Sequence, residues 1–316
     1  MPIQCQCLFE AGQNVGWDQR RFAAPAHQQF SMFLDGGPAL EARWSHPTLK
    51  QAMALMPIRY HLAIVLALFA TAIAKSGLAE EPAPAEPSLS TEQRATLTKT
   101  FEKSLAEANN LVEADSKNTS AYSSRGDALF FLGRFDEAVA DYEQMVKLDE
   151  SLGNSHWRRG IAFFYAGRFK DAAAQFESYH SFDQVDRENG IWRYLSQHKA
   201  YGQKQAREGL LKYEKDDREP FPAVYNLFAG TMTPQQILDA IDKAKLSKDE
   251  REKRLFYSHL YIGLNHAVEG DDAAAQRHLR LSTLNKWGPS AGYGPNYMWQ
   301  VGRLHEELLR TKPAKK

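Results

Sequence analysis

The sequence has little cysteine, no net charge and almost no long apolar stretch. Only two cysteines, Cys5 and Cys7, occur among the 316 residues, which excludes a disulfide-stapled fold. Lysine plus arginine equals aspartate plus glutamate at 39 each, so no excess of positive charge favours binding to nucleic acid. The mean hydropathy of −0.53 excludes a protein built of several membrane spans.

The motifs of common enzymes are also missing. The chain has no glycine-rich phosphate loop, no HExxH zinc motif and no GxSxG nucleophile motif. Acidic residues are plentiful, but they are spaced as on solvated helix surfaces. We therefore predict no enzyme, no cofactor and no metal site.

The single long apolar run covers 62–74 and has 13 residues, whereas a membrane-spanning helix needs about 20. Arg59 precedes the run, and Gly77-Leu78-Ala79 follows it as a small-x-small sequence. This order is typical of a secretory signal peptide, which we place at 53–79. Cleavage after Ala79 would leave an exported chain, in the periplasm, in the cell envelope or secreted, with no stable membrane span.

The segments on either side of this signal do not look folded. Residues 1–52 show no sustained period, and we interpret them as an extension from a mis-assigned start codon or as disordered. The alternative is a cytosolic tail ahead of a short signal anchor. Residues 80–89 are rich in proline and alanine, which predicts an extended linker.

An internal repeat is the strongest signal in the chain. Residues 118–151 align with 152–185 at a constant offset of 34 and without a gap. The matched pairs are Arg125-Gly126 with Arg159-Gly160, Gly133-Arg134-Phe135 with Gly167-Arg168-Phe169, Ala138 with Ala172, and Tyr142 with Phe176. Weaker traces continue the pattern at Ala206, Leu210, Gly263, Gly270, Ala275 and Leu279.

The spacing within each repeat predicts two antiparallel helices. A glycine inside the first helix allows the second helix to approach closely, and the next glycine ends the first helix in a left-handed cap. One such hairpin cannot bury its own apolar side, so several hairpins must stack. The sequence therefore predicts an all-α helical solenoid.

This pattern resembles the tetratricopeptide repeat (TPR) family, whose units are 34-residue helical hairpins. The resemblance implies a right-handed superhelix, although the usual proline after the second helix is replaced by Glu150 and Gln184. A signal peptide, few repeats and a divergent C-terminal half also resemble, distantly, the NlpI type of bacterial envelope adaptor. The predicted segments are an N-terminal capping helix at 90–117, two clear units at 118–185, divergent helical repeats at 186–254, a TPR-like unit at 255–288, and a capping helix with tail at 289–316.

The concave face of such a solenoid is lined by the first helix of each hairpin, so we expect a protein or peptide partner there. The predicted contact residues are Ser123, Asp127, Phe130 and Phe131 in the first unit, Trp157, Ile161, Phe164 and Tyr165 in the second, and Ile191, Leu195 and His198 in the third. Aromatic residues dominate and cations are few, which favours an apolar or aromatic segment over a terminal carboxylate. The basic pair Arg158-Arg159 is expected to pair with nearby acids.

Three alternatives remain open at this stage. The same aromatic residues can pack within the chain or form a homodimer, which would make the protein a structural homo-oligomer. A metal- or glycan-binding accessory module of an envelope enzyme could use His259, His266 and the aromatic residues near 286–299, namely Trp287, Tyr293, Tyr297 and Trp299. Those aromatic residues can equally form the C-terminal cap that a solenoid needs.

Overall fold

The computed structural model describes residues 88–215 and 217–312. The predicted extension 1–52, the signal peptide 53–79 and most of the linker 80–89 lie outside the described residues. Every regular element in the described ranges is a helix, so the expected all-α class is confirmed. None of these helices is both long and apolar enough to cross a lipid bilayer.

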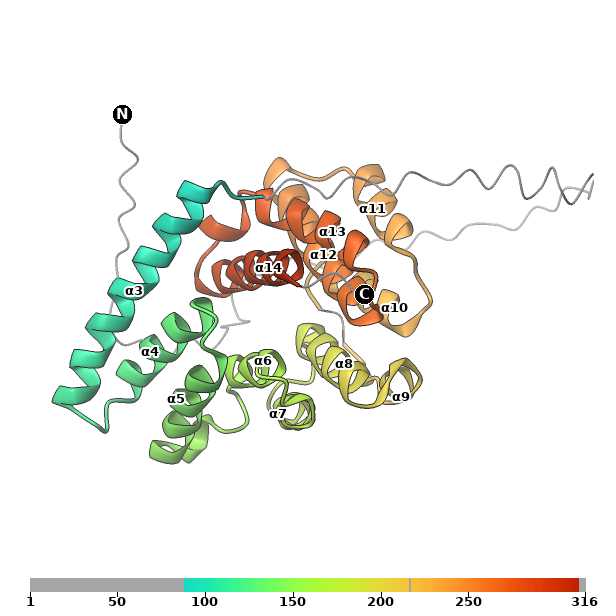
Figure 1. The fold of residues 1–316 in the computed structure, drawn as a ribbon. Helices are drawn as coiled ribbons and strands as arrows, with labels where there is room; N and C mark the ends of the chain where they lie inside the picture. Colours follow the sequence, from blue (N-terminus) through green and yellow to red (C-terminus); the bar gives the residue numbers. More distant parts are fainter. Residues whose placement is uncertain (1–87, 216, 313–316) are drawn as a thin grey trace, which may run out of the picture. The chain divides into compact units, whose positions relative to one another are not determined.

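Most of the helices follow one another with short connections, and a longer one joins α9 to α10 (Figure 1). In chain order they are α3 (Thr91–Ala114), α4 (Thr119–Phe131), α5 (Phe135–Leu148), η2 (Glu150–Leu152), α6 (Trp157–Tyr165), α7 (Phe169–Phe182), α8 (Arg187–Tyr201), α9 (Gln203–Glu208), α10 (Phe221–Ala229), α11 (Pro234–Lys243), α12 (Lys248–Glu269), α13 (Asp272–Leu284), η3 (Gly288–Ser290) and α14 (Tyr293–Thr311).

Helix α3 begins at a capping box and covers the first hairpin. The side chain of Ser90 accepts from the backbone N–H of Gln93, and the Gln93 side chain accepts from the backbone N–H of Ser90. The helix packs against α4, where the rings of Phe101 and Phe131 have centroids 5.2 Å apart. Helix α3 therefore covers part of the apolar side of α4.

A glycine in the first helix allows the two helices of each regular hairpin to approach closely. A Cβ atom on Gly126 would lie 2.6 Å from the Tyr142 ring, and one on Gly160 would lie 2.6 Å from the Phe176 ring. Neither distance leaves room for a methyl group. The aromatic residue of the second helix thus packs directly on the backbone of the first, which explains why both residues recur with the same period.

The two regular hairpins also share one turn geometry. Gly133 and Gly167 adopt φ of +78° and +75°, the left-handed conformation that costs glycine little. The next backbone N–H reaches back to the first helix, from Arg134 to the Leu129 carbonyl at 2.9 Å and from Arg168 to the Phe163 carbonyl at 2.8 Å. This is the expected glycine cap, in its Schellman form.

The hairpin of α12 and α13 repeats the crossing with an aliphatic residue. A Cβ atom on Gly263 would lie 2.8 Å from Leu279, and Gly270 ends α12 with φ of +88°. Helix α12 begins at Lys248, ahead of the unit that the spacing predicts at 255–288. Its first turns thus extend beyond a standard repeat.

The helices between α7 and α12 do not form regular hairpins. Helix α8 packs against α7 as the first helix of a third unit, but its partner α9 has only six residues. Buried Ala206 on α9 occupies the expected small position. The chain then reaches α10 and α11 through an irregular segment. The 34-residue spacing is therefore interrupted where the structure inserts a loop and two short helices.

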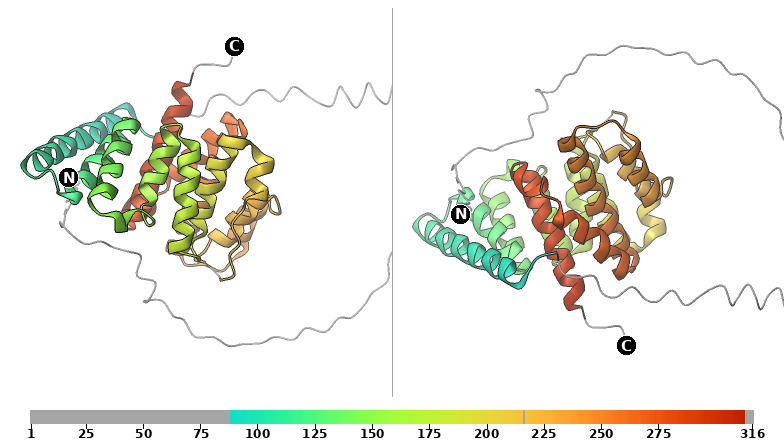
Figure 2. Two further views of the ribbon diagram at one scale, coloured as in Figure 1. Left: turned by 90° about the horizontal axis from the view of Figure 1, so that it is seen from below. Right: turned by 90° about the horizontal axis from the view of Figure 1, so that it is seen from above.

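Helix α14 lies between the two ends of this helical array. It packs against α13 and also contacts α4 (Figures 1 and 2). Pro295 falls in its first turn, where a missing N–H leaves no helical hydrogen bond unmade. The helix that was expected only as a cap thus also reaches the first repeat.

Candidate protein-binding site

The predicted partner-contact residues lie on the first helices of three successive units. Trp157 and Tyr165 on α6 are half-buried, as are Ser123, Asp127 and His198 on α4 and α8. The remaining six are buried, namely Phe130, Phe131, Ile161, Phe164, Ile191 and Leu195. The predicted face is present in the fold, but it is covered in this structure.

Part of this face is covered by α14, through Tyr297. Its ring centroid lies 4.8 Å from that of Phe131, 4.9 Å from Trp157 and 5.8 Å from Phe130. Tyr297 is itself almost fully buried. The contact with Phe130 is stacked, that with Phe131 is tilted and that with Trp157 is edge-on, and stacked and edge-on arrangements are those that aromatic rings prefer. The aromatic surface of α4 and α6 therefore accepts a helix that inserts a tyrosine.

A polar cluster around Asp127 adjoins this aromatic contact. The Asp127 carboxylate accepts from the Tyr142 hydroxyl at 2.5 Å, from the Arg158 guanidinium at 2.7 Å and from the Tyr293 hydroxyl of α14 at 2.5 Å. Arg158 also donates to Ser123 at 2.9 Å. The expected pairing with an acid is confirmed for Arg158, and the acid is one of the predicted site residues, whereas Arg159 donates to the Gln175 side-chain oxygen at 2.7 Å.

These phenols act as neutral donors. Burial raises the pKa of Tyr142 well above its usual value, and the negative charge of Asp127 raises it further. Desolvation at the contact with Asp127 and the charge of that carboxylate also raise the pKa of the Tyr293 hydroxyl, although much of the Tyr293 side chain is exposed. Asp127 therefore receives two uncharged hydrogen bonds and one charged partner, Arg158.

A second polar contact joins α14 to α6. The Tyr165 hydroxyl and the His305 Nδ1 atom lie 2.9 Å apart. Burial lowers the pKa of His305 to about 4 and raises that of Tyr165, so both groups are neutral at pH 7. No pattern in the sequence singles out His305, because a lone histidine on a terminal helix has no informative spacing.

The other buried members of the predicted set pack inside the helical array. The Phe164 ring lies 5.4 Å from Phe169 and 5.6 Å from Trp192, between α6, α7 and α8. Ile191 and Leu195 are fully buried. This burial is the packing within the chain that the sequence left open as an alternative, and contact of these residues with a partner stays a prediction. Counting along the helix identified the helices, but it does not separate the side that faces the next hairpin from the concave side.

Comparison with protein families agrees with this geometry. A family model for the tetratricopeptide repeat matches residues 101–152 and 123–184, which contain the two regular hairpins and most of α3. Residues 101–184 are tetratricopeptide repeats. A comparison with curated proteins found no match. The repeats imply a general protein-binding scaffold.

The predicted histidine pair, His259 and His266, lies outside the matched tetratricopeptide repeats and contacts a third histidine. His278 on α13 places its Nδ1 atom 3.0 Å from that of His259, and its ring stacks on His266 with centroids 5.8 Å apart. Burial lowers the pKa of His259 and of His278 to about 4. Within residues 88–215 and 217–312, no group of three or more histidine, cysteine, aspartate or glutamate side chains is arranged to hold a metal ion.

The aromatic residues near 286–299 do not form one site either. Trp287 packs on Phe256 and Tyr257, with centroids 5.9 and 5.8 Å away. Trp299 is buried and donates from Nε1 to the Thr283 carbonyl at 2.8 Å. These side chains pack against α12 and α13, whereas Tyr293 and Tyr297 contact the tetratricopeptide repeats.

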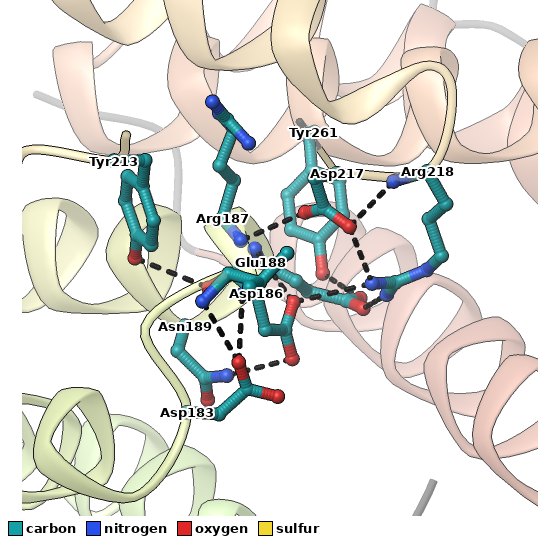
Figure 3. A network of polar contacts seen from close by, with 10 residues as sticks. Asp183, Asp186, Arg187, Glu188, Asn189, Tyr213, Asp217, Arg218 and Tyr261 are labelled. Carbon is teal, nitrogen blue, oxygen red and sulfur yellow. Dashed lines mark hydrogen bonds and ion pairs between the residues drawn. The ribbon is translucent and has the colours of Figure 1, made fainter. Parts of the chain in front are cut away.

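A buried acidic network anchors the irregular segment (Figure 3). Arg218 contacts Asp186 at 3.3 Å, Glu188 at 2.5 Å and Asp217 at 3.2 Å. The Tyr261 hydroxyl of α12 donates to Glu188. Burial raises the pKa of Glu188 to about 7, with Arg218 opposing and Asp186 adding to the rise. This network ties the N-terminus of α8 to α12 and positions the helices that follow the repeats.

Proposed function

We propose that this chain is a non-catalytic scaffold that binds a partner protein through the concave face of α4 and α6. The observation that carries the proposal is the seating of α14 on that face, where Tyr297 contacts three aromatic residues and Tyr293 reaches Asp127. A surface that accommodates one helix of suitable chemistry is suited to accept another. The tetratricopeptide repeats at 101–184 support a binding role for these helices.

Photocrosslinking at two positions tests this proposal. A photoreactive phenylalanine analogue replaces Tyr293, which is 59% exposed beside the face, or Leu111, which is 52% exposed on α3. We expect one crosslinked product from position 293 in the producing cell, and its loss when Trp157→Ala is added. Identical products from both positions, or a product that is insensitive to Trp157→Ala, would contradict binding at this face.

We also propose that the scaffold is exported. Support comes from Arg59, the apolar run at 62–74 and the small residues that end at Ala79. The distant likeness to NlpI-type envelope adaptors rests on the same order of segments and stays a proposal. Intact-mass analysis of the chain recovered from the producing cell tests export: we expect the N-terminus at Glu80, and a chain that retains residues 53–79 contradicts it.

A further inference from the structure

Helix α14 has two sides with different neighbours. Tyr293, Tyr297 and His305 follow at intervals of four and eight residues, so they lie along one side of the helix. All three contact the repeats, at Asp127, at the aromatic surface and at Tyr165. This side reproduces the chemistry of a helical ligand, with a tyrosine inserted among rings and a polar group at each end.

The opposite side belongs to the C-terminal hairpin. Trp299 donates to the Thr283 carbonyl of α13. A Cβ atom on Gly302 would lie 3.0 Å from Leu260 of α12, so the helix backbone there rests directly on its neighbour. Helix α14 can therefore keep its packing on α12 and α13 while the contacts with the repeats separate.

The contacts between α14 and the repeats, here called the seam, can separate while α14 stays packed on α12 and α13. Both of its hydrogen bonds to the repeats, from Tyr293 and at His305, join groups across a large sequence distance, 166 and 140 residues. At one end of the seam Tyr293 is 59% exposed. An incoming helix can therefore begin to replace α14 there, without first entering a closed core.

We propose that α14 is a built-in competitor for the binding face, and that the external partner presents an amphipathic helix of the same pattern. That helix carries two aromatic residues four positions apart, of which the first donates a hydrogen bond to Asp127 and the second inserts among Phe130, Phe131 and Trp157. A polar residue eight positions further meets Tyr165. This inference rests on the proposed function and adds the chemistry of the partner and the regulation of the face.

The competition has a quantitative consequence. A tethered ligand acts at an effective concentration in the millimolar range, so it lowers the apparent affinity of any free helix for the same face. The free helix binds only the fraction of molecules in which the face is open, and its apparent dissociation constant equals the intrinsic constant divided by that fraction. Weakening α14 must therefore strengthen the binding of a free helix, whereas weakening an ordinary capping helix would not.

The experiment uses a fluorescein-labelled peptide of residues 291–312 as the probe, with the full chain and fluorescence anisotropy. We expect weak binding to the unaltered chain and binding at least tenfold tighter to Tyr297→Ala. Tyr293→Phe, which removes only the hydrogen bond to Asp127, should tighten binding a few-fold. Leu308→Ala is the matched control on α14, because Leu308 is 39% exposed and its loss should leave the affinity unchanged.

Two further measurements keep the outcomes distinct. Adding Trp157→Ala to Tyr297→Ala should abolish the gained affinity, because it removes the ring against which the peptide tyrosine packs. Circular dichroism on each variant verifies that the helices are retained, and Tyr293→Phe still tests the inference if Tyr297→Ala does not fold. No gain of affinity in either variant overturns the inference. If crosslinking from position 293 still captures a partner in that case, the proposed function survives without the competitor.

Discussion

The phenol oxygen of Tyr293 lies 2.5 Å from the carboxylate of Asp127, although 166 residues separate them in the chain. This contact joins the last helix of the chain to the first tetratricopeptide repeat. It shows that the array closes on itself through α14.

Phe164→Ala should destabilise the chain by about 3–5 kcal/mol, because a buried ring between α6, α7 and α8 is replaced by a cavity. Equilibrium denaturant unfolding, followed by circular dichroism, measures the effect. Phe182→Ala is the matched control, since that ring is 62% exposed and its removal should change stability by less than about 0.5 kcal/mol. Equal effects from the two variants would show that Phe164 is not a core residue.

Gly160→Ala should destabilise the second repeat by about 1–3 kcal/mol, because the added methyl group would lie 2.6 Å from the Phe176 ring. Alanine would otherwise stabilise a helix interior by about 1 kcal/mol relative to glycine. Combining Gly160→Ala with Phe176→Leu should recover part of the loss, because the two atoms nearest the added methyl group, Cζ and Cε2 of the Phe176 ring, have no counterpart in leucine. Additive losses in a double-mutant cycle would argue against direct packing between these two positions.

Glu188 should make the chain less stable as the pH rises from 6 to 8. Burial raises its pKa in the folded chain to about 7, above the ordinary value of 4.5, so the folded state holds the proton longer than the unfolded state. The stabilisation is therefore complete below pH 4.5 and is lost as the pH passes 7. We expect the melting temperature to fall between pH 6 and 8 for the unaltered chain, and to fall less for Glu188→Gln. Parallel curves for the two chains would show that Glu188 is already ionised at pH 6.

His305 should make the chain less stable as the pH falls from 7 to 5. Burial depresses its pKa to about 4 from the ordinary 6.5, so its contribution is present above pH 6.5 and is lost as the pH falls towards 4. Between pH 7 and 5 the melting temperature of the unaltered chain should therefore fall more than that of His305→Gln. His259 and His278 have the same depressed pKa in both chains, so their effect cancels in the difference. An NMR titration that places the His305 pKa near 6.5 would contradict its burial against Tyr165.

Tyr165→Phe should cost about 0.5–1.5 kcal/mol, because it removes the hydrogen bond to Nδ1 of the half-buried His305 while the ring packing is retained. Thermal unfolding at pH 7 measures the loss. Tyr201→Phe on α8 is the matched control, as that side chain is 46% exposed. A loss of the same size in both variants would indicate that the contact between Tyr165 and His305 contributes nothing.

Much of the regular part of the fold could be read from residue spacing. Gly126 with Tyr142 and Gly160 with Phe176 are contacts between adjacent helices, so each pair leaves a trace at a fixed distance along the chain. The site was only partly predictable, because its contacts with α14 join residues far apart in the chain and leave no such trace. Helical counting located Phe130, Trp157 and Tyr165 on α4 and α6, but it could not show that Phe164 faces α7 and α8 while Tyr165 faces α14.

The amino-acid order alone determined the repeat, its helical hairpins and their glycine caps, because each depends on neighbours within about one repeat. Only the tertiary structure decided that α14 returns to the first repeat and covers its aromatic face. That return depends on the summed rotations of all the intervening helices, including the irregular segment that Arg218 and Glu188 hold in place. No local pattern encodes such a sum, so the contact between Tyr293 and Asp127 could not be read from either residue's surroundings in the sequence.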